Sequence, residues 1–145
     1  MLRRLCVLLA LLAPSALQAE AGLVVIVNLD SGVTRLTRDQ AANIFMGRQK
    51  RLPSGLVALP VEQRVPPEVR LRFYQYLVHR SVNQVRAYWA RLYFSGEAQP
   101  PRQTRNSEET LAVIAANRGA IGFVEKGQAD RRVRAVLELG GEEDH

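Results

Sequence analysis

Residues 117–124, Asn-Arg-Gly-Ala-Ile-Gly-Phe-Val, decide the fold. The stretch is typical of the end of a helix, a tight turn and then a strand. We expect Gly119 to end the helix in the left-handed conformation, which costs glycine little. Residues 120–124 carry no charge and no polar alternation, which predicts a strand covered on both faces. Gly122 leaves room for a close neighbour, and packing of a helix is favoured over a ligand there.

The segment before this stretch predicts the helix itself. Asn106 and Glu109 have the spacing of a capping box, which satisfies free N–H groups at a helix start. Leu111, Ile114 and Ala115 recur at helical spacing and predict one buried face.

The first 21 residues predict a secretory signal peptide. Two arginines precede an apolar run over residues 5–13, and small residues follow near Ala19 and Ala21. That run is shorter than the roughly 20 residues needed to span a bilayer, so cleavage and export to the periplasm are expected, with an uncleaved anchor as the alternative. The single cysteine, Cys6, lies within this segment. Disulfides and thiolate chemistry are therefore excluded from the remainder.

The remainder has the size of one domain, predicted over residues 22–139, with a disordered acidic tail over residues 140–145. The chain has a formal net charge of +6, and nearly all of its basic residues are arginines. Arginine suits bidentate contact with carboxylate or phosphate, so an anionic partner fits the composition. Nucleic acid is not expected, because no basic-aromatic module is present.

Strand and helix patterns alternate along this domain. Phe73 and Trp89 lie on apolar stripes of two middle helices, which predicts core packing. The predicted elements are strands over residues 22–29, 56–61 and 133–139, a helix from Thr37 to Gly47, helices starting at Pro66 and Ser81, and a connection over residues 99–104. This alternation predicts an α/β fold with a mostly parallel sheet flanked by helices.

Several short motifs occur in an order and spacing that match a known family. They are Asn28, Ile44-Phe45-Met46-Gly47, Pro53, Gly55, Pro60-Val61, Phe73, Tyr88-Trp89, Phe94-Ser95-Gly96 and residues 119–124. Together they resemble one lobe of the phosphate-binding proteins of bacterial phosphate ABC transporters, which are type II periplasmic binding proteins. The resemblance implies that fold and a small anion such as phosphate as ligand. In the family two lobes close over the anion, and this chain supplies one.

The chain departs from the family at the phosphate loop. The family's loop, Arg-Ser-Asp-Gly-Ser-Gly-Thr, runs into a helix whose N–H groups and hydroxyls hold phosphate. Aligned without gaps, Gln63 takes the arginine position and Pro67-Glu68-Val69 replaces Ser-Gly-Thr. Two adjacent prolines remove N–H donors, and the glutamate adds a negative charge. Arg64 and Arg70 compensate in part, so phosphate binding is expected to be weak or absent.

Catalysis is not expected from this sequence. His79 and His145 belong to no serine–histidine–acid arrangement, and the Glu108-Glu109 pair is explained by the start of a helix. No residues have metal-ligand spacing, and no cofactor is implied.

Two non-enzymatic functions stay open. In the first, the domain binds a small anion or other solute at the strand-end crevice of an open α/β sheet, with Asn28, Gln63, Arg64 and Arg70 as its polar groups. In the second, it is a periplasmic interaction or accessory protein that kept the lobe's fold and lost the ligand site. Pairing of two copies as a homodimer, to give a two-walled cleft, is also left open.

Overall fold

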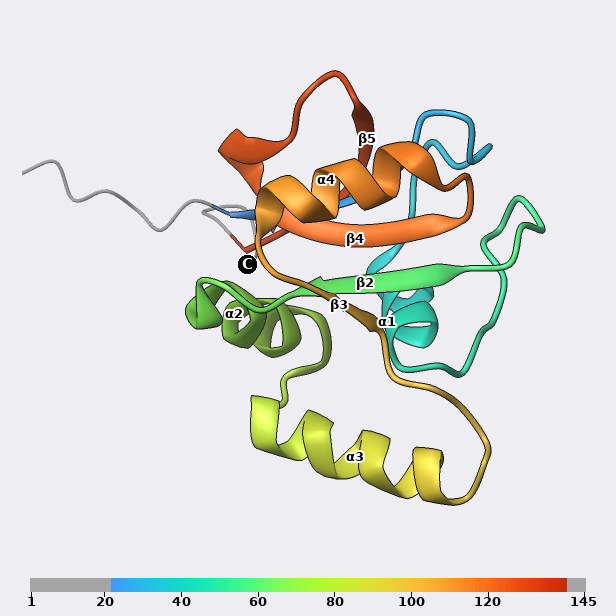
Figure 1. Cartoon of the computed structure of the whole chain (residues 1–145), viewed down its shortest axis with the longest axis vertical. Helices are drawn as coiled ribbons and strands as arrows, with labels where there is room; N and C mark the ends of the chain where they lie inside the picture. The colour runs from blue at the N-terminus through green and yellow to red at the C-terminus, as the bar shows by residue number, and fades with distance from the viewer. Residues whose placement is uncertain (1–21, 141–145) are drawn as a thin grey trace, which may run out of the picture.

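The computed structural model describes residues 22–140, so the predicted signal peptide and residues 141–145 of the predicted tail lie outside it. No helix in the described range is long and apolar enough to cross a membrane. The elements are β1 (Leu23–Asn28), α1 (Arg38–Phe45), β2 (Leu59–Gln63), α2 (Pro67–Val78), α3 (Val82–Phe94), β3 (Arg102–Thr104), α4 (Ser107–Ala116), β4 (Ala120–Glu125), the 3-10 turn η1 (Lys126–Gln128) and β5 (Val133–Leu139) (Figure 1).

The five strands form one sheet in the order β3-β2-β4-β1-β5. β2 runs parallel to both β3 and β4, whereas β1 runs antiparallel to both β4 and β5. Four strands therefore point the same way and β1 alone opposes them, which confirms the predicted mostly parallel sheet. The edge strand β3 falls in the segment predicted as a connection. Its three residues are all polar and give no strand pattern, and β3 is a strand only because it pairs with β2.

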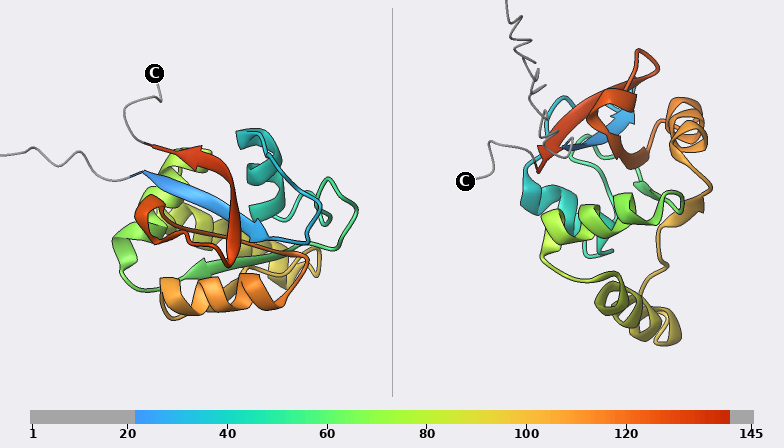
Figure 2. Two further views of the ribbon diagram at one scale, coloured as in Figure 1. Left: turned by 90° about the horizontal axis from the view of Figure 1, so that it is seen from above. Right: turned by 90° about the vertical axis from the view of Figure 1, so that its left-hand side faces the viewer.

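Helices cover both faces of the sheet (Figure 2). On one face α4 packs Leu111 and Ile114 against Val24 and Val124. On the other face α1 and α2 cover a larger core, where Phe73 stacks on Phe123 of β4 at 3.7 Å between ring centroids. α3 packs against α2 and lies farther from the sheet. β4 is buried on both faces, as predicted from its apolar run.

The two glycines of the deciding stretch serve different purposes. A Cβ on Gly122 would lie 3.2 Å from side-chain atoms of Ile114 and Thr110, so packing of α4 explains this glycine, as expected. The predicted left-handed cap at Gly119 is wrong: α4 ends at Ala116, and Gly119 has no positive φ. A Cβ there would lie 2.1 Å from the Val57 carbonyl oxygen. Glycine is needed at position 119 because the backbone of the loop before β2 passes too close to leave room for a side chain.

The buried face of α4 also differs from the prediction. Leu111 and Ile114 are buried, but Ala115 is exposed, and Thr110 completes the face. The Thr110 hydroxyl lies 2.7 Å from the Thr104 hydroxyl, so a hydrogen bond satisfies this polar group inside the core. A rule based on apolar residues alone misses such a position.

Candidate functional site

The carboxyl ends of β2 and β3 meet at one edge of the sheet. Gln63 pairs with Thr104 there, and each strand leads directly into a helix, β2 into α2 and β3 into α4. Ligands of open α/β sheets bind outside such strand ends, beside helix N-termini. A ligand site is therefore expected at this edge of the sheet.

Three of the four predicted site residues lie at this edge. Gln63 is fully buried, and its Nε2 donates to the carbonyl of Val65 at 3.0 Å. Its Oε1 is buried without a hydrogen-bond partner among the described residues. Arg64 is exposed, and Arg70 follows on the first turns of α2. The structure thus brings two cations and one amide together.

Asn28 lies elsewhere and has a different set of partners. It ends β1, which is antiparallel to its neighbours, so it lies at the opposite end of the sheet from Gln63. Its Nδ2 donates to the carbonyls of Ile114 and Ala115 at 2.9 and 3.0 Å, and its Oδ1 accepts from the Asp30 N–H. These bonds satisfy free carbonyls at the end of α4, so Asn28 has a structural role.

The start of α2 offers few backbone donors. The N–H groups of Arg64 and Val65 donate to carbonyls of the chain after β3, at Thr104 and Arg105. Residues 66 and 67 are prolines without an N–H group, and the Val69 N–H donates to the Pro66 carbonyl. Glu68 supplies the one other N–H in residues 64–69, together with its negative side chain. A cradle of several convergent donors, which phosphate requires, is therefore not formed here.

A buried carboxylate is the centre of the polar cluster at this edge. Glu62 of β2 is 3 % exposed, and its carboxylate accepts hydrogen bonds from the Tyr74 hydroxyl and, at 3.3 Å, from the Gln103 amide. An Arg70 guanidinium nitrogen lies 3.3 Å from the same carboxylate. Burial, followed by the Glu62 charge and hydrogen bond, raises the pKa of Tyr74 well above its usual value. Tyr74 therefore stays protonated and keeps donating.

Glu62 is not among the residues predicted for the site, because the strand pattern of β2 ends at Val61. One signal was available: Arg70 and Tyr74 are four residues apart, so they share a face of α2. A cation and a phenol on the face of a helix that packs against a strand indicate that the strand carries a buried acid between them.

Two hollows open beside Arg70. One, of about 390 Å³, lies between α3 and the sheet edge and includes Glu62, Gln103 and Arg86. The other, of about 460 Å³, lies at the start of α2 and includes Arg64 and Glu68. Arg70 and Arg86 line both hollows, and Arg64 lines the second. The region therefore presents three arginines against two acids, Glu62 and Glu68, and Glu62 is already paired with Arg70.

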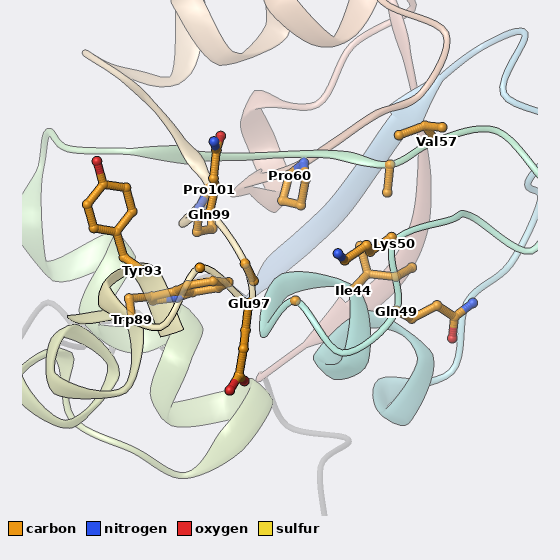
Figure 3. A pocket seen from close by; sticks show the side chains of 14 residues that line it. Ile44, Gln49, Lys50, Val57, Pro60, Trp89, Tyr93, Glu97, Gln99 and Pro101 are labelled. Atoms are coloured by element: carbon orange, nitrogen blue, oxygen red, sulfur yellow. The ribbon is translucent and has the colours of Figure 1, made fainter. Parts of the chain in front are cut away.

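A third hollow, of about 410 Å³, lies between the loop after α1 and the end of α3 (Figure 3). Its walls include Trp89, Tyr93 and Pro101, which also line the hollow between α3 and the sheet edge. Trp89, predicted as a core residue, is 7 % exposed and packs as predicted, yet it also forms a wall of both hollows.

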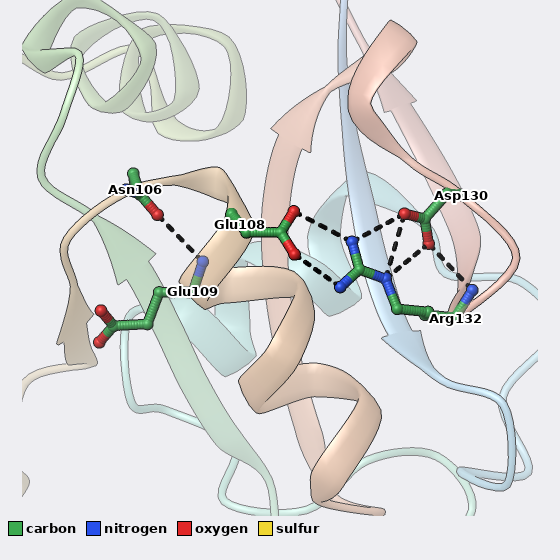
Figure 4. A network of polar contacts seen from close by, with 5 residues as sticks. All are labelled: Asn106, Glu108, Glu109, Asp130 and Arg132. Carbon is green, nitrogen blue, oxygen red and sulfur yellow. Dashed lines mark hydrogen bonds and ion pairs between the residues drawn. The ribbon is translucent and has the colours of Figure 1, made fainter.

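The acids predicted to belong to a helix start are structural. The Asn106 side chain caps α4 by accepting from the Glu109 N–H at 3.0 Å. Glu108 binds both terminal nitrogens of Arg132, which also binds Asp130 (Figure 4). Hydrogen bonding to Arg132 lowers the pKa of both acids. The network ties α4 to the chain before β5.

Within residues 22–140 no group of three or more histidine, cysteine or acidic side chains is placed to hold a metal ion. His79 is the C-cap of α2, in the left-handed conformation with φ 56°.

Comparison with solved structures shows where this architecture occurs. An ABC-type phosphate transport receptor from Vibrio cholerae aligns at 20 % identity and a TM-score of 0.65, over 82 % of this chain and 46 % of the receptor. A putative phosphate ABC transporter substrate-binding protein from Clostridium perfringens, with bound phosphate, aligns at 17 % identity and 0.66, over 81 % and 45 %. PstS from Borrelia burgdorferi aligns at 12 % identity and 0.61, over 81 % and 48 %. No known family profile and no curated protein matches the sequence.

The fold is therefore that of one lobe of a substrate-binding protein of the phosphate-transporter type. The chain spans less than half the length of these solved structures. The resemblance noted in the sequence is confirmed at the level of the fold, and the neighbours are transport proteins rather than enzymes.

Proposed function

We propose that this chain is an exported solute-binding domain that holds a small anion beside Arg70, where β2, α2 and α3 meet. The observation that carries the proposal is the state of the Arg70 guanidinium. One of its terminal nitrogens is held by Glu62, while its Nε is buried without a partner among the described residues. Arg70 is thus an oriented cation with donor capacity to spare, and Arg86 lines the same two hollows.

Phosphate is not the natural ligand in this proposal. The N–H groups of Arg64 and Val65 are already used, two prolines have none, and Glu68 adds a like charge at the helix start. The excess of arginine attracts anions, but that attraction is long-ranged and screened by salt. We expect isothermal titration at physiological ionic strength to give a phosphate dissociation constant weaker than about 1 μM, equivalent to about −8 kcal/mol. Tighter binding would contradict the reading of this loop.

A thermal-shift screen tests the anion site itself. The full chain, expressed with its own N-terminal segment and purified from the periplasm, is heated with phosphate, sulfate or other inorganic oxyanions. A specific anion at about 100 times its dissociation constant adds about 2.7 kcal/mol of stability. Arg86→Ala should remove the shift, and Arg91→Ala, an exposed arginine on the same helix, should keep it. N-terminal sequencing of the same sample checks cleavage after Ala19 or Ala21.

A second candidate function is an interaction or accessory protein without a ligand. One support is the Glu62 carboxylate, which already pairs with Arg70 as a bound anion would. Another is the pair of exposed apolar side chains Val65 and Leu71, the second of which lines the hollow at the start of α2. If no anion in the screen stabilises the protein, this second function replaces the first.

A further inference from the structure

The third hollow opens at the other end of β2 from the anion site, although Trp89, Tyr93 and Pro101 line both it and one hollow beside Arg70. Val57 and Pro60, which line it, precede or begin β2, whereas α2 and the Arg64–Glu68 region follow the other end of that strand. Apolar side chains form most of its visible wall in Figure 3, where Ile44, Pro60, Trp89 and Pro101 surround the opening. Ligand sites in proteins are typically concave, mostly apolar and 300–1,000 Å³ in volume, and this hollow of about 410 Å³ fits that description.

Contacts with α1 hold the aromatic wall of the hollow in place. The Trp89 ring packs so closely on Gly47 that a Cβ there would lie 2.7 Å from the ring, and Gly47 has φ 73°. The neighbouring Tyr88 hydroxyl donates to the Met46 carbonyl at 2.6 Å. This hydrogen bond and this packing together fix α3 to the end of α1. The wall is therefore formed before any ligand arrives, which lowers the entropy cost of binding.

Lys50 gives the hollow a single cation. Its side chain points toward the centre of the opening in Figure 3, while the Glu97 carboxylate points away from it. No hydrogen bond or ion pair of the Lys50 ammonium is found within residues 22–140. The Nε1 of Trp89 is also buried without a hydrogen-bond partner in that range.

From this geometry we propose that the hollow binds a small carboxylate with a flat apolar body. The body would lie against Trp89 and the proline side chains, where burial of apolar surface favours binding. The carboxylate would pair with the Lys50 ammonium, a charge-assisted contact stronger than a neutral hydrogen bond. This ligand class differs from an inorganic oxyanion, which has no apolar body to bury.

The protein itself supplies the probe, because Trp89 is its one tryptophan. We would titrate the full chain with phenylacetate and follow tryptophan emission, and repeat the titration with phenylacetamide, which has nearly the same shape and no charge. Wild type should show a saturable change with phenylacetate. Lys50→Ala should weaken that binding by about tenfold or more, as expected for loss of a charge-assisted contact. Binding of phenylacetamide should be weaker in wild type and unchanged in Lys50→Ala.

Two control variants locate the ligand. Lys126→Ala removes the chain's other lysine, which pairs with Glu138 on the surface, and should leave the phenylacetate titration within about twofold of wild type. Arg91→Ala removes an exposed arginine of α3 that lines none of the three hollows, and should also leave the titration unchanged. A saturable signal lost in Arg86→Ala and kept in Lys50→Ala would overturn the proposal. So would a signal that never saturates, or one equally strong with phenylacetamide. The anion site proposed above would survive each of these three results, because Lys50 does not line it.

Discussion

Replacing Asn28 by alanine should destabilise the protein strongly without touching the anion site. The side chain makes three hydrogen bonds, two to carbonyls at the end of α4 and one from the Asp30 N–H, and it is 5 % exposed. At about 1 kcal/mol for each bond, the loss is about 3 kcal/mol of unfolding free energy. For a domain of this size that corresponds to a drop of roughly 10 °C in melting midpoint.

Urea unfolding followed by Trp89 fluorescence and by circular dichroism measures this loss. Asn28→Asp should cost at least as much, because it removes both donors and sets a negative charge against the negative end of the helix dipole. Asn117→Ala is a matched control at the same helix end, where a single bond to the Val113 carbonyl is lost, and should cost about 1 kcal/mol. A loss below about 1 kcal/mol for Asn28→Ala, or an aspartate milder than alanine, would refute the structural role of Asn28.

Three further predictions concern packing and charge. Gly119→Ala should destabilise by about 3 kcal/mol or more, since its Cβ would lie 2.1 Å from the Val57 oxygen. The control Gly127→Ala, whose Cβ would have nothing within 4 Å, should change stability by less than about 0.5 kcal/mol. Equal midpoints of the two variants in chemical denaturation would disprove the close approach at Gly119. Trp89→Ala should cost about 3 to 5 kcal/mol by circular dichroism, and an unchanged melting midpoint would show that this side chain is not a packed wall. Arg132 lowers the pKa of Glu108 and Asp130 below their ordinary values of 4.5 and 3.8, so their contribution to stability is present above those values and lost as the pH falls through the lowered ones. Arg132→Met should therefore flatten the loss of stability between about pH 5 and pH 3, and an identical pH dependence in wild type and variant would argue against the network of Figure 4.

Local signals in the sequence predicted the elements well. The helices predicted from Thr37 and Ser81 are both formed, and each is closed by a capping box with the glutamine three residues later. β5 begins and ends at the predicted residues. Such features depend on residues a few positions apart, which is the range over which side-chain periodicity and capping act. The apolar run of β4 predicted a strand buried on both faces for the same reason.

The candidate site depended on contacts that no local pattern records. Asn28 meets Ile114 across 86 positions of sequence, so an amide that looked available for a ligand is used by a helix end. Packing of α2 against the sheet pairs Glu62 with Arg70. Pairing of β2 with β3 puts Glu62 within hydrogen-bond distance of Gln103, although β3 has no strand pattern of its own.

By itself, then, the sequence determined an α/β lobe with its helices, most of its strands and a cluster of cations after β2. Only the tertiary structure decided that β1 is antiparallel to its neighbours and that the backbone at Val57 passes close to Gly119. It also decided that the buried carboxylate of Glu62 forms an ion pair with Arg70. The physical reason is that strand direction and the pairing of buried polar groups are set by which distant segments pack together, and the free energy of that packing depends on the whole chain.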